Sequence, residues 1–274
     1  TNRTFLEPKT FTYRDRRNMR VHGVEPDYFE DPIEGCNKEL QNLMKAKKEE
    51  YQVLLESAKN SIAPEFLRMD APSLSFKDFL QALEAYREQV NDLAKFGFLG
   101  DEDSKALNVI NSISESDYND KLFFKGAFLS LYVEKYAKTL TPFNYLYVKM
   151  DVFRSIINER NTGTNKHVEY SARGIEYYNG DQIIPLNCLS SGEKNDFIMF
   201  FDLIFRLKNK SIVIIDEPEI SLHIIWQEKY IDNIVSALRG KDCQVIISTH
   251  SPDIISVHEN MIVSLDIKKE EIND

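Results

Sequence analysis

Cysteine is scarce in this sequence. It occurs three times, as Cys36, Cys188 and Cys243, and no two of these residues have CxxC spacing. A disulfide framework and a thiolate zinc site both need cysteines grouped in sequence or space, so the pattern argues against both. Widely spaced, unpaired cysteines are typical of the reducing cytosol. We therefore expect a cytoplasmic protein whose cysteines are small buried hydrophobic residues.

Long hydrophobic runs and positive charge are also lacking. The longest apolar stretches, FFKGAFLSLYV and SIVIIDEP, are too short or too interrupted by charge to cross a bilayer, and we expect no membrane partner. The formal net charge of −10 argues against nonspecific coating of nucleic acid. The local basic stretch YRDRRNMR keeps nucleic-acid contact as an alternative, although such runs more often form a solvated strand edge or loop.

The residues that are present divide the chain into three regions. Residues 1–30 alternate loosely and predict one or two strands, residues 31–160 predict helices, and residues 161–274 return to strands mixed with helices. Within the helical region, Ser75 is the predicted N-cap of a helix over SFKDFLQALEAYREQVNDLAKF, and Pro142 is expected to break or kink a later helix.

The last region has the pattern of an α/β fold. The dipeptide Asn179-Gly180 predicts a tight antiparallel hairpin. SIVIIDEPE and CQVIISTHSP are short apolar runs that end in polar residues, as buried parallel strands do, and a helix is predicted between them over about 222–238. We therefore predict an α/β protein with a parallel core sheet, an antiparallel β-hairpin portion and a long helical insertion.

Candidate functional residues follow the two apolar runs. Asp216 and Glu217 end the first run, and a carboxylate pair there calls for a strong partner such as Mg²⁺ with phosphate oxygens; the alternative is a solvated turn. His250 ends the second run. A lone histidine is more often structural, but parallel strands end at one edge of a sheet, so His250 could lie beside both acids.

A further candidate site precedes a predicted helix. The stretch CLSSGEKNDF, residues 188–197, places small polar residues before an apolar segment. The unpaired N–H groups and the macrodipole of a helix N-terminus favour an anion there. Phosphate is an anion that this arrangement suits.

Taken in order, LSSGE, IVIIDE, PEISLH and IISTHSP resemble the signature motif, Walker B motif, D-loop and H-loop of ABC-type ATPases. The resemblance implies that ATP and Mg²⁺ are bound, that Asp216 supports Mg²⁺, that Glu217 is the general base and that His250 contacts the γ-phosphate. It also implies a homodimer with composite nucleotide sites. Its signature residues would bind the nucleotide of the opposite protomer; these are Ser190, Ser191, Gly192 and Glu193. Its D-loop, with Ser221 and His223, would cross the interface between the protomers.

The sequence departs from this family in one respect. It contains no GxxxxGK[ST] loop, and its Gly-Lys dipeptide, Gly240-Lys241, is followed by Asp242. ATP hydrolysis requires such a Walker A segment. We expect it to precede Thr1, so that residues 1–30 are the remnant of an N-terminal ATPase lobe, residues 31–160 the helical insertion and residues 161–274 the C-terminal lobe. The alternative is a noncatalytic homologue.

The long charged insertion is similar to that of the soluble SMC/OLD-like branch of these ATPases. The stretch DEPEISLH looks most similar to PtuA-type antiphage ATPases of Septu and retron systems, which implies a partner nuclease, HNH-type or another effector. We therefore expect a nucleotide-dependent switch that controls such a partner. A noncatalytic ABC-like scaffold and a DNA repair or recombination ATPase are the alternatives.

Overall fold

The computed structural model describes residues 31–100, 114–119, 125–222, 224–256 and 258–263. Their contacts divide them into two compact units, with the division between Ser190 and Ser191. The strands expected in residues 1–30, and the chain beyond residue 263, lie outside the described residues. The domain boundaries expected at residues 30 and 160 stay a prediction.

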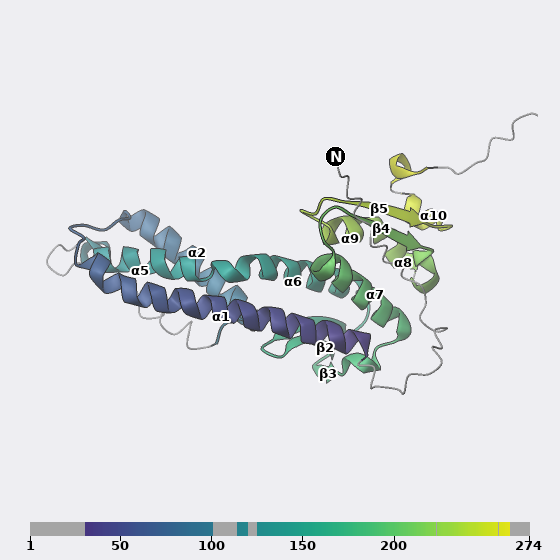
Figure 1. Ribbon diagram of the computed structural model, residues 1–274, viewed down its shortest axis with the longest axis horizontal. Coiled ribbons are helices and arrows are strands. Elements are labelled where there is room, and N and C mark those ends of the chain that lie inside the picture. Colours follow the sequence, from purple (N-terminus) through teal and green to yellow (C-terminus); the bar gives the residue numbers. More distant parts are fainter. Residues whose placement is uncertain (1–30, 101–113, 120–124, 223, 257, 264–274) are drawn as a thin grey trace, which may run out of the picture. The chain divides into compact units, whose positions relative to one another are not determined.

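The first unit is a layer of long helices with a small antiparallel sheet (Figure 1). Helix α1 packs against α5 and α6, and α2 packs against α5. None of the described helices is both long enough and apolar enough to cross a membrane. The helices of this unit are α1 (Pro32–Phe66), α2 (Phe76–Lys95), α4 (Glu115–Tyr118), α5 (Lys125–Thr139) and α6 (Thr141–Arg160).

Local sequence signals set the beginnings of these helices. The predicted cap at Ser75 is confirmed, because its hydroxyl accepts a hydrogen bond of 3.2 Å from the Asp78 amide. Pro142 lies in the first turn of α6, directly after the end of α5, and so begins a new helix. Proline is tolerated there because the first turn of a helix needs no intrahelical N–H donor.

Aromatic side chains join the helices to the sheet. Phe143 is fully buried, with ring centroids 5.3 Å from Tyr51 and 4.8 Å from Phe98. Phe96 stacks on Tyr170 of the first strand at 5.1 Å. Such buried rings contribute a large share of the apolar area that stabilises a helical unit.

The hairpin predicted at Asn179-Gly180 is confirmed. Strands β1 (Lys166–Ser171), β2 (Gly174–Asn179) and β3 (Gln182–Ile184) pair antiparallel in the order β1-β2-β3. The β2–β3 pairing brings Asn179 opposite Gln182, and Gly180 in the turn has a φ of 59°. The sheet is tied to α6 by Asn158, whose side chain bonds both the amide and the carbonyl of Val168.

The second unit contains a pair of parallel strands with short helices. Strands β4 (Ser211–Asp216) and β5 (Cys243–Ser248) pair residue for residue, which confirms the predicted parallel sheet. The helix predicted between them is divided into α8 (Ile224–Gln227) and α9 (Tyr230–Ala237). The other elements are α7 (Ser191–Phe201), the π-helical turn η4 (Asp202–Arg206), the 3₁₀ turns η5 (Pro218–Ser221) and η6 (Glu259–Met261), and α10 (Pro252–Ile255).

One face of this parallel sheet is open among the described residues. Ile212 and Ile214 of β4 and Ile246 of β5 are 55%, 45% and 49% exposed. Alternate residues of a strand share a face, so these three side chains form one apolar surface. The prediction that both strands are buried is therefore wrong for this face in the part of the chain that the structure describes.

Gly97 and Gly163 both have a positive φ, but an added Cβ would meet backbone atoms at Gly97 and open space at Gly163. Gly97 follows α2 with a φ of 74°, and a Cβ there would lie 2.5 Å from the backbone nitrogen of Ala172; Gly163 has a φ of 88° and nothing within 4 Å. We expect Gly163→Ala to lower the free energy of unfolding by about 1 kcal/mol through strain alone. We expect Gly97→Ala to cost at least about 2 kcal/mol more, because backbone atoms must move. Urea unfolding followed by circular dichroism measures both, and equal losses would contradict the close approach.

Candidate functional site

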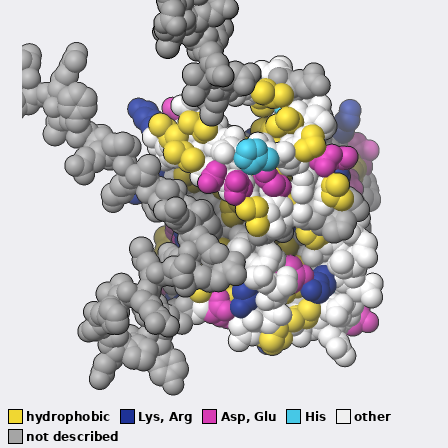
Figure 2. Space-filling view, turned by 90° about the vertical axis from the view of Figure 1, so that its right-hand side faces the viewer, with side chains coloured by type: hydrophobic (Ala, Val, Ile, Leu, Met, Phe, Trp, Pro, Cys, Tyr) yellow, Lys and Arg dark blue, Asp and Glu magenta, His cyan; other side chains and the backbone are white. Residues whose placement is uncertain are grey.

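The parallel register brings the predicted functional residues of the two strands to one edge of the sheet. Asp216, the last residue of β4, lies opposite Ser248, the last residue of β5, and His250 follows two residues later. The Glu217 amide extends this pairing by donating a hydrogen bond of 2.8 Å to the Ser248 carbonyl. Asp216, Glu217 and His250 are all exposed. Figure 2 shows acidic side chains beside a histidine on one face of the molecule.

Glu217 has a strained backbone. Its φ of 46° and ψ of 54° place it in the left-handed region, where a side chain other than glycine costs about 1–2 kcal/mol. This conformation ends β4 sharply and leads into η5, which begins at Pro218. Strain of this kind is concentrated at functional sites. The backbone of Glu217 therefore agrees with its prediction as a functional residue.

Glu219 is a residue whose role was not inferred from the sequence. One carboxylate oxygen accepts a hydrogen bond of 2.7 Å from the His250 amide, and the other accepts one of 2.8 Å from the Thr249 hydroxyl. Burial raises the pKa of Glu219, but bonds from the amides of His250 and of Glu219 itself and from the Thr249 hydroxyl outweigh it and hold the pKa below its ordinary value. The only signal for Glu219 in the sequence is a third acid soon after the strand.

A second side chain holds the loop that carries His250. The Ser251 hydroxyl donates to the side-chain oxygen of Gln227, and it accepts from the Asp253 amide at 3.2 Å as the cap of α10. The Gln227 side chain also donates to the Leu222 carbonyl at 3.2 Å. The loop after β5 is therefore joined on both sides of His250 to the segment that follows β4.

The predicted anion site lies at the beginning of α7. Ser191 is its first residue and is exposed, while Gly192 and Glu193 are half-buried in its first turn; Ser190, exposed, immediately precedes the helix. Phe197, Phe200 and Phe201 are fully buried and anchor α7 in its unit. The helix predicted after this stretch is therefore confirmed, while anion binding at its beginning stays a prediction.

The Gly-Lys dipeptide, Gly240-Lys241, contributes to the structure through the hydrogen bonds of its lysine. Gly240 and Lys241 follow α9, and the Lys241 ammonium donates to the carbonyls of Leu203, Ile204 and Leu207 at the end of η4. Cations stabilise the C-terminal end of a helix, where unpaired carbonyls collect. Lys241 therefore stabilises the far end of the helical segment that begins at Ser191.

The segment predicted to be a D-loop is described in part. Ser221 is the last residue of η5, while His223 lies outside the described residues. The prediction that these two residues cross an interface between protomers is not tested and stays a prediction.

The residues at the sheet edge fit a Mg²⁺–nucleotide ligand in part. The exposed Asp216 carboxylate supplies an oxygen ligand of the kind that Mg²⁺ prefers. Among the described residues, no group of three or more His, Cys, Asp or Glu side chains is arranged to hold a metal ion by itself. Such a site would therefore need oxygen ligands from the nucleotide and from water, as Mg²⁺ sites in ATPases commonly do.

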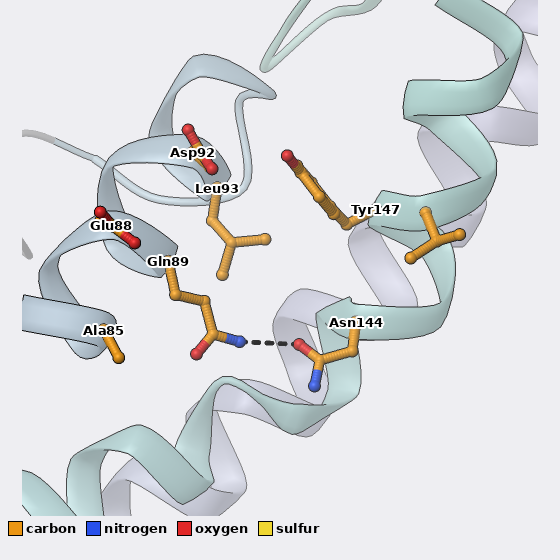
Figure 3. A pocket seen from close by; sticks show the side chains of 8 residues that line it. Ala85, Glu88, Gln89, Asp92, Leu93, Asn144 and Tyr147 are labelled. Carbon is orange, nitrogen blue, oxygen red and sulfur yellow. Dashed lines mark hydrogen bonds between the residues drawn. The ribbon is translucent and has the colours of Figure 1, made fainter. Parts of the chain in front are cut away.

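A separate cavity of about 340 Å³ lies between α2 and α6 (Figure 3). Gln89 of α2 and Asn144 of α6 bridge it with a hydrogen bond of 2.7 Å, and Glu88 and Asp92 also line it. Burial, together with the charge of Asp92, raises the pKa of Tyr147 on its wall. Two carboxylates make this hollow unfavourable for a nucleotide phosphate.

The contacts of Glu219 predict a pH dependence. Because its pKa in the folded protein is lowered, these contacts stabilise fully above the pKa of the unfolded state, and their contribution is lost as the pH falls through the folded pKa. We expect carbon-detected NMR to show the Glu219 carboxyl titrating below its ordinary range. Thr249→Val, which removes one donor, should raise that pKa. An unchanged pKa in this variant would contradict the assigned hydrogen bond.

A family model agrees with an ATPase fold for this chain. The family model described as AAA ATPase domain matches residues 34–255, which include the helical unit, the beginning of α7 and both parallel strands. Comparison with curated proteins gives no match. The mostly helical α/β fold, with its small parallel sheet and antiparallel hairpin sheet, is consistent with such a domain. The chain belongs to the AAA ATPase domain family.

Proposed function

We propose that this chain is part of an ATP-hydrolysing switch of ABC type. The observation that carries the proposal is the edge of the parallel sheet, where the register of β4 and β5 places Asp216 and Glu217 next to the loop of His250. Membership of the AAA ATPase domain family supports nucleotide-dependent ATPase activity in general. The specific roles of the residues belong to the proposal.

The three exposed side chains divide the chemistry between them. A Mg²⁺ ion would neutralise charge on the β- and γ-phosphates of ATP. Asp216 would hold this ion, directly or through its water shell, because it supplies a carboxylate at the carboxyl end of β4. Glu217 would orient the attacking water and accept its proton, and His250 would donate a hydrogen bond to the γ-phosphate.

The start of α7 would complete the site of a second protomer. The Ser190 and Ser191 hydroxyls and the N–H groups of Gly192 and Glu193 would bind the γ-phosphate of the nucleotide in the opposite subunit. ATP would then favour the closed homodimer, because the γ-phosphate adds contacts that the open state lacks. Ser221 and His223 would lie at the interface.

The switch would act on a partner. We propose that opening and closing of the dimer are transmitted through the helical unit to a separate nuclease, HNH-type or another effector, in antiphage defence of the Septu or retron kind. The support is the resemblance of DEPEISLH to PtuA-type ATPases. A cytoplasmic location and contact with nucleic acid remain predictions.

One observation favours a second candidate, a noncatalytic scaffold. These 274 residues contain no GxxxxGK[ST] loop, which hydrolysis requires for the β-phosphate and for the hydroxyl ligand of Mg²⁺. If the complete protein lacks the loop and binds no ATP, the scaffold is the better assignment.

The role of Glu217 is tested by Glu217→Gln in the full-length protein. We expect Mg²⁺-dependent phosphate release to fall by about 10²–10⁴-fold, since the amide cannot accept the proton of the water. Binding of a fluorescent ATP analogue should persist. Glu228→Gln, at an exposed position, serves as the matched control and should hydrolyse normally. Equal hydrolysis by the Glu217→Gln and wild-type proteins would refute this role.

The composite site is tested by Gly192→Asp. The new carboxylate would lie in the first turn of α7, where it suits the helix dipole but repels a phosphate, so the fold should remain intact. We expect ATP binding to persist while ATP-dependent dimers, measured by light scattering, are lost together with hydrolysis. Asn195→Asp adds the same charge at an exposed position one turn further along the helix and should dimerise normally. Normal hydrolysis by Gly192→Asp would disprove the composite site.

A further inference from the structure

Three acids lie within four positions at the end of β4 and directly after it, and the structure gives them different surroundings. Asp216 and Glu217 are exposed, whereas Glu219 is half-buried. Both carboxylate oxygens of Glu219 are engaged, one by the His250 amide and one by the Thr249 hydroxyl. A carboxylate whose two oxygens both accept hydrogen bonds is fixed in orientation, and it is a weaker base than a free carboxylate.

The contacts of Glu219 cross from one loop to another. Glu219 lies in η5, after β4, while Thr249 and His250 lie after β5, about thirty residues later in the chain. Hydrogen bonds to a charged acceptor are stronger than neutral ones, and two bonds to one carboxylate define its orientation as well as its position. The carboxylate therefore restrains the backbone on which His250 stands.

We propose that Glu219 is the positioning residue for His250. It holds the His250 backbone at the sheet edge where Glu217 also lies, so that the imidazole and the Glu217 carboxylate face the same ligand. This inference rests on the proposed function, because it assigns His250 to a nucleotide site. It adds a residue that contacts neither the nucleotide nor the attacking water and acts through its two hydrogen bonds.

The position of Glu219 also suits it to transmit movement of the predicted interface segment to His250. It lies two residues before Ser221, the end of η5, in the segment predicted to face a second protomer. A displacement of this segment on dimer closure or opening would be passed to His250 through the carboxylate. Gln227, which accepts from Ser251, provides a second connection between the same two segments.

The test measures amide exchange and hydrolysis in the full-length protein. In Glu219→Ala we expect the His250 amide to exchange at least about tenfold faster than in the wild type, which corresponds to about 1.4 kcal/mol. Glu219→Gln keeps one acceptor oxygen, so the exchange rate of the His250 amide should lie between those of the wild type and Glu219→Ala. Glu219→Asp keeps the carboxylate and should restore part of the protection that Glu219→Ala loses. Glu228→Ala, at an exposed position of the neighbouring segment, is the control and should leave exchange unchanged.

Steady-state kinetics separate positioning from a merely structural role. We expect kcat of Glu219→Ala to fall about tenfold or more with KM for ATP within about twofold, because an interaction needed in the transition state is weakened. Glu219→Asp should recover part of kcat. Unchanged exchange of the His250 amide in Glu219→Ala, or a kcat equal to that of the control, would overturn the proposal. A wild-type protein without ATP hydrolysis would overturn the proposed function, while amide exchange, which needs no nucleotide, still decides whether Glu219 holds His250.

Discussion

The parallel pairing of β4 with β5 is the interaction on which the candidate site depends. Because the strands run in the same direction and pair residue for residue, both end at the same edge of the sheet. Asp216 and His250 are far apart in the chain and are brought to that edge by this register. A shift by one residue would turn every side chain of one strand to the opposite face and disperse the site.

The edge is maintained by polar contacts between the two segments that leave it. The Glu217 amide pairs with Ser248, Glu219 holds Thr249 and His250, and Gln227 bonds Ser251. This network leaves the carboxylates of Asp216 and Glu217 exposed while the carboxylate of Glu219 is engaged. In the proposed function, chemistry and support are thus assigned to different acids of one short stretch.

Much of the architecture followed from local patterns. The cap at Ser75, the break before Pro142 and the hairpin at Asn179-Gly180 were predicted and are confirmed, because each depends on residues close in sequence. The parallel strands were also predicted and are confirmed: each was indicated by its own apolar run, although their pairing joins residues far apart in the chain. Three predictions differed from the structure. Cys188, which was expected to be buried, is exposed. The single helix expected after residue 222 is divided into α8 and α9, and one face of the parallel sheet is open among the described residues. Packing against distant elements decides both features.

The sequence by itself determined the kinds of residue at the site and the elements that carry them. Apolar runs that end in Asp216-Glu217 and in His250, and small polar residues before α7, indicate phosphate chemistry because strand and helix ends expose such groups. Only the tertiary structure decided that Glu217 is left-handed, that Glu219 supports His250 and that Lys241 stabilises the end of a helix. These three features depend on contacts between residues about thirty positions apart or on a backbone conformation. Neither can be inferred from the spacing of residues in the sequence.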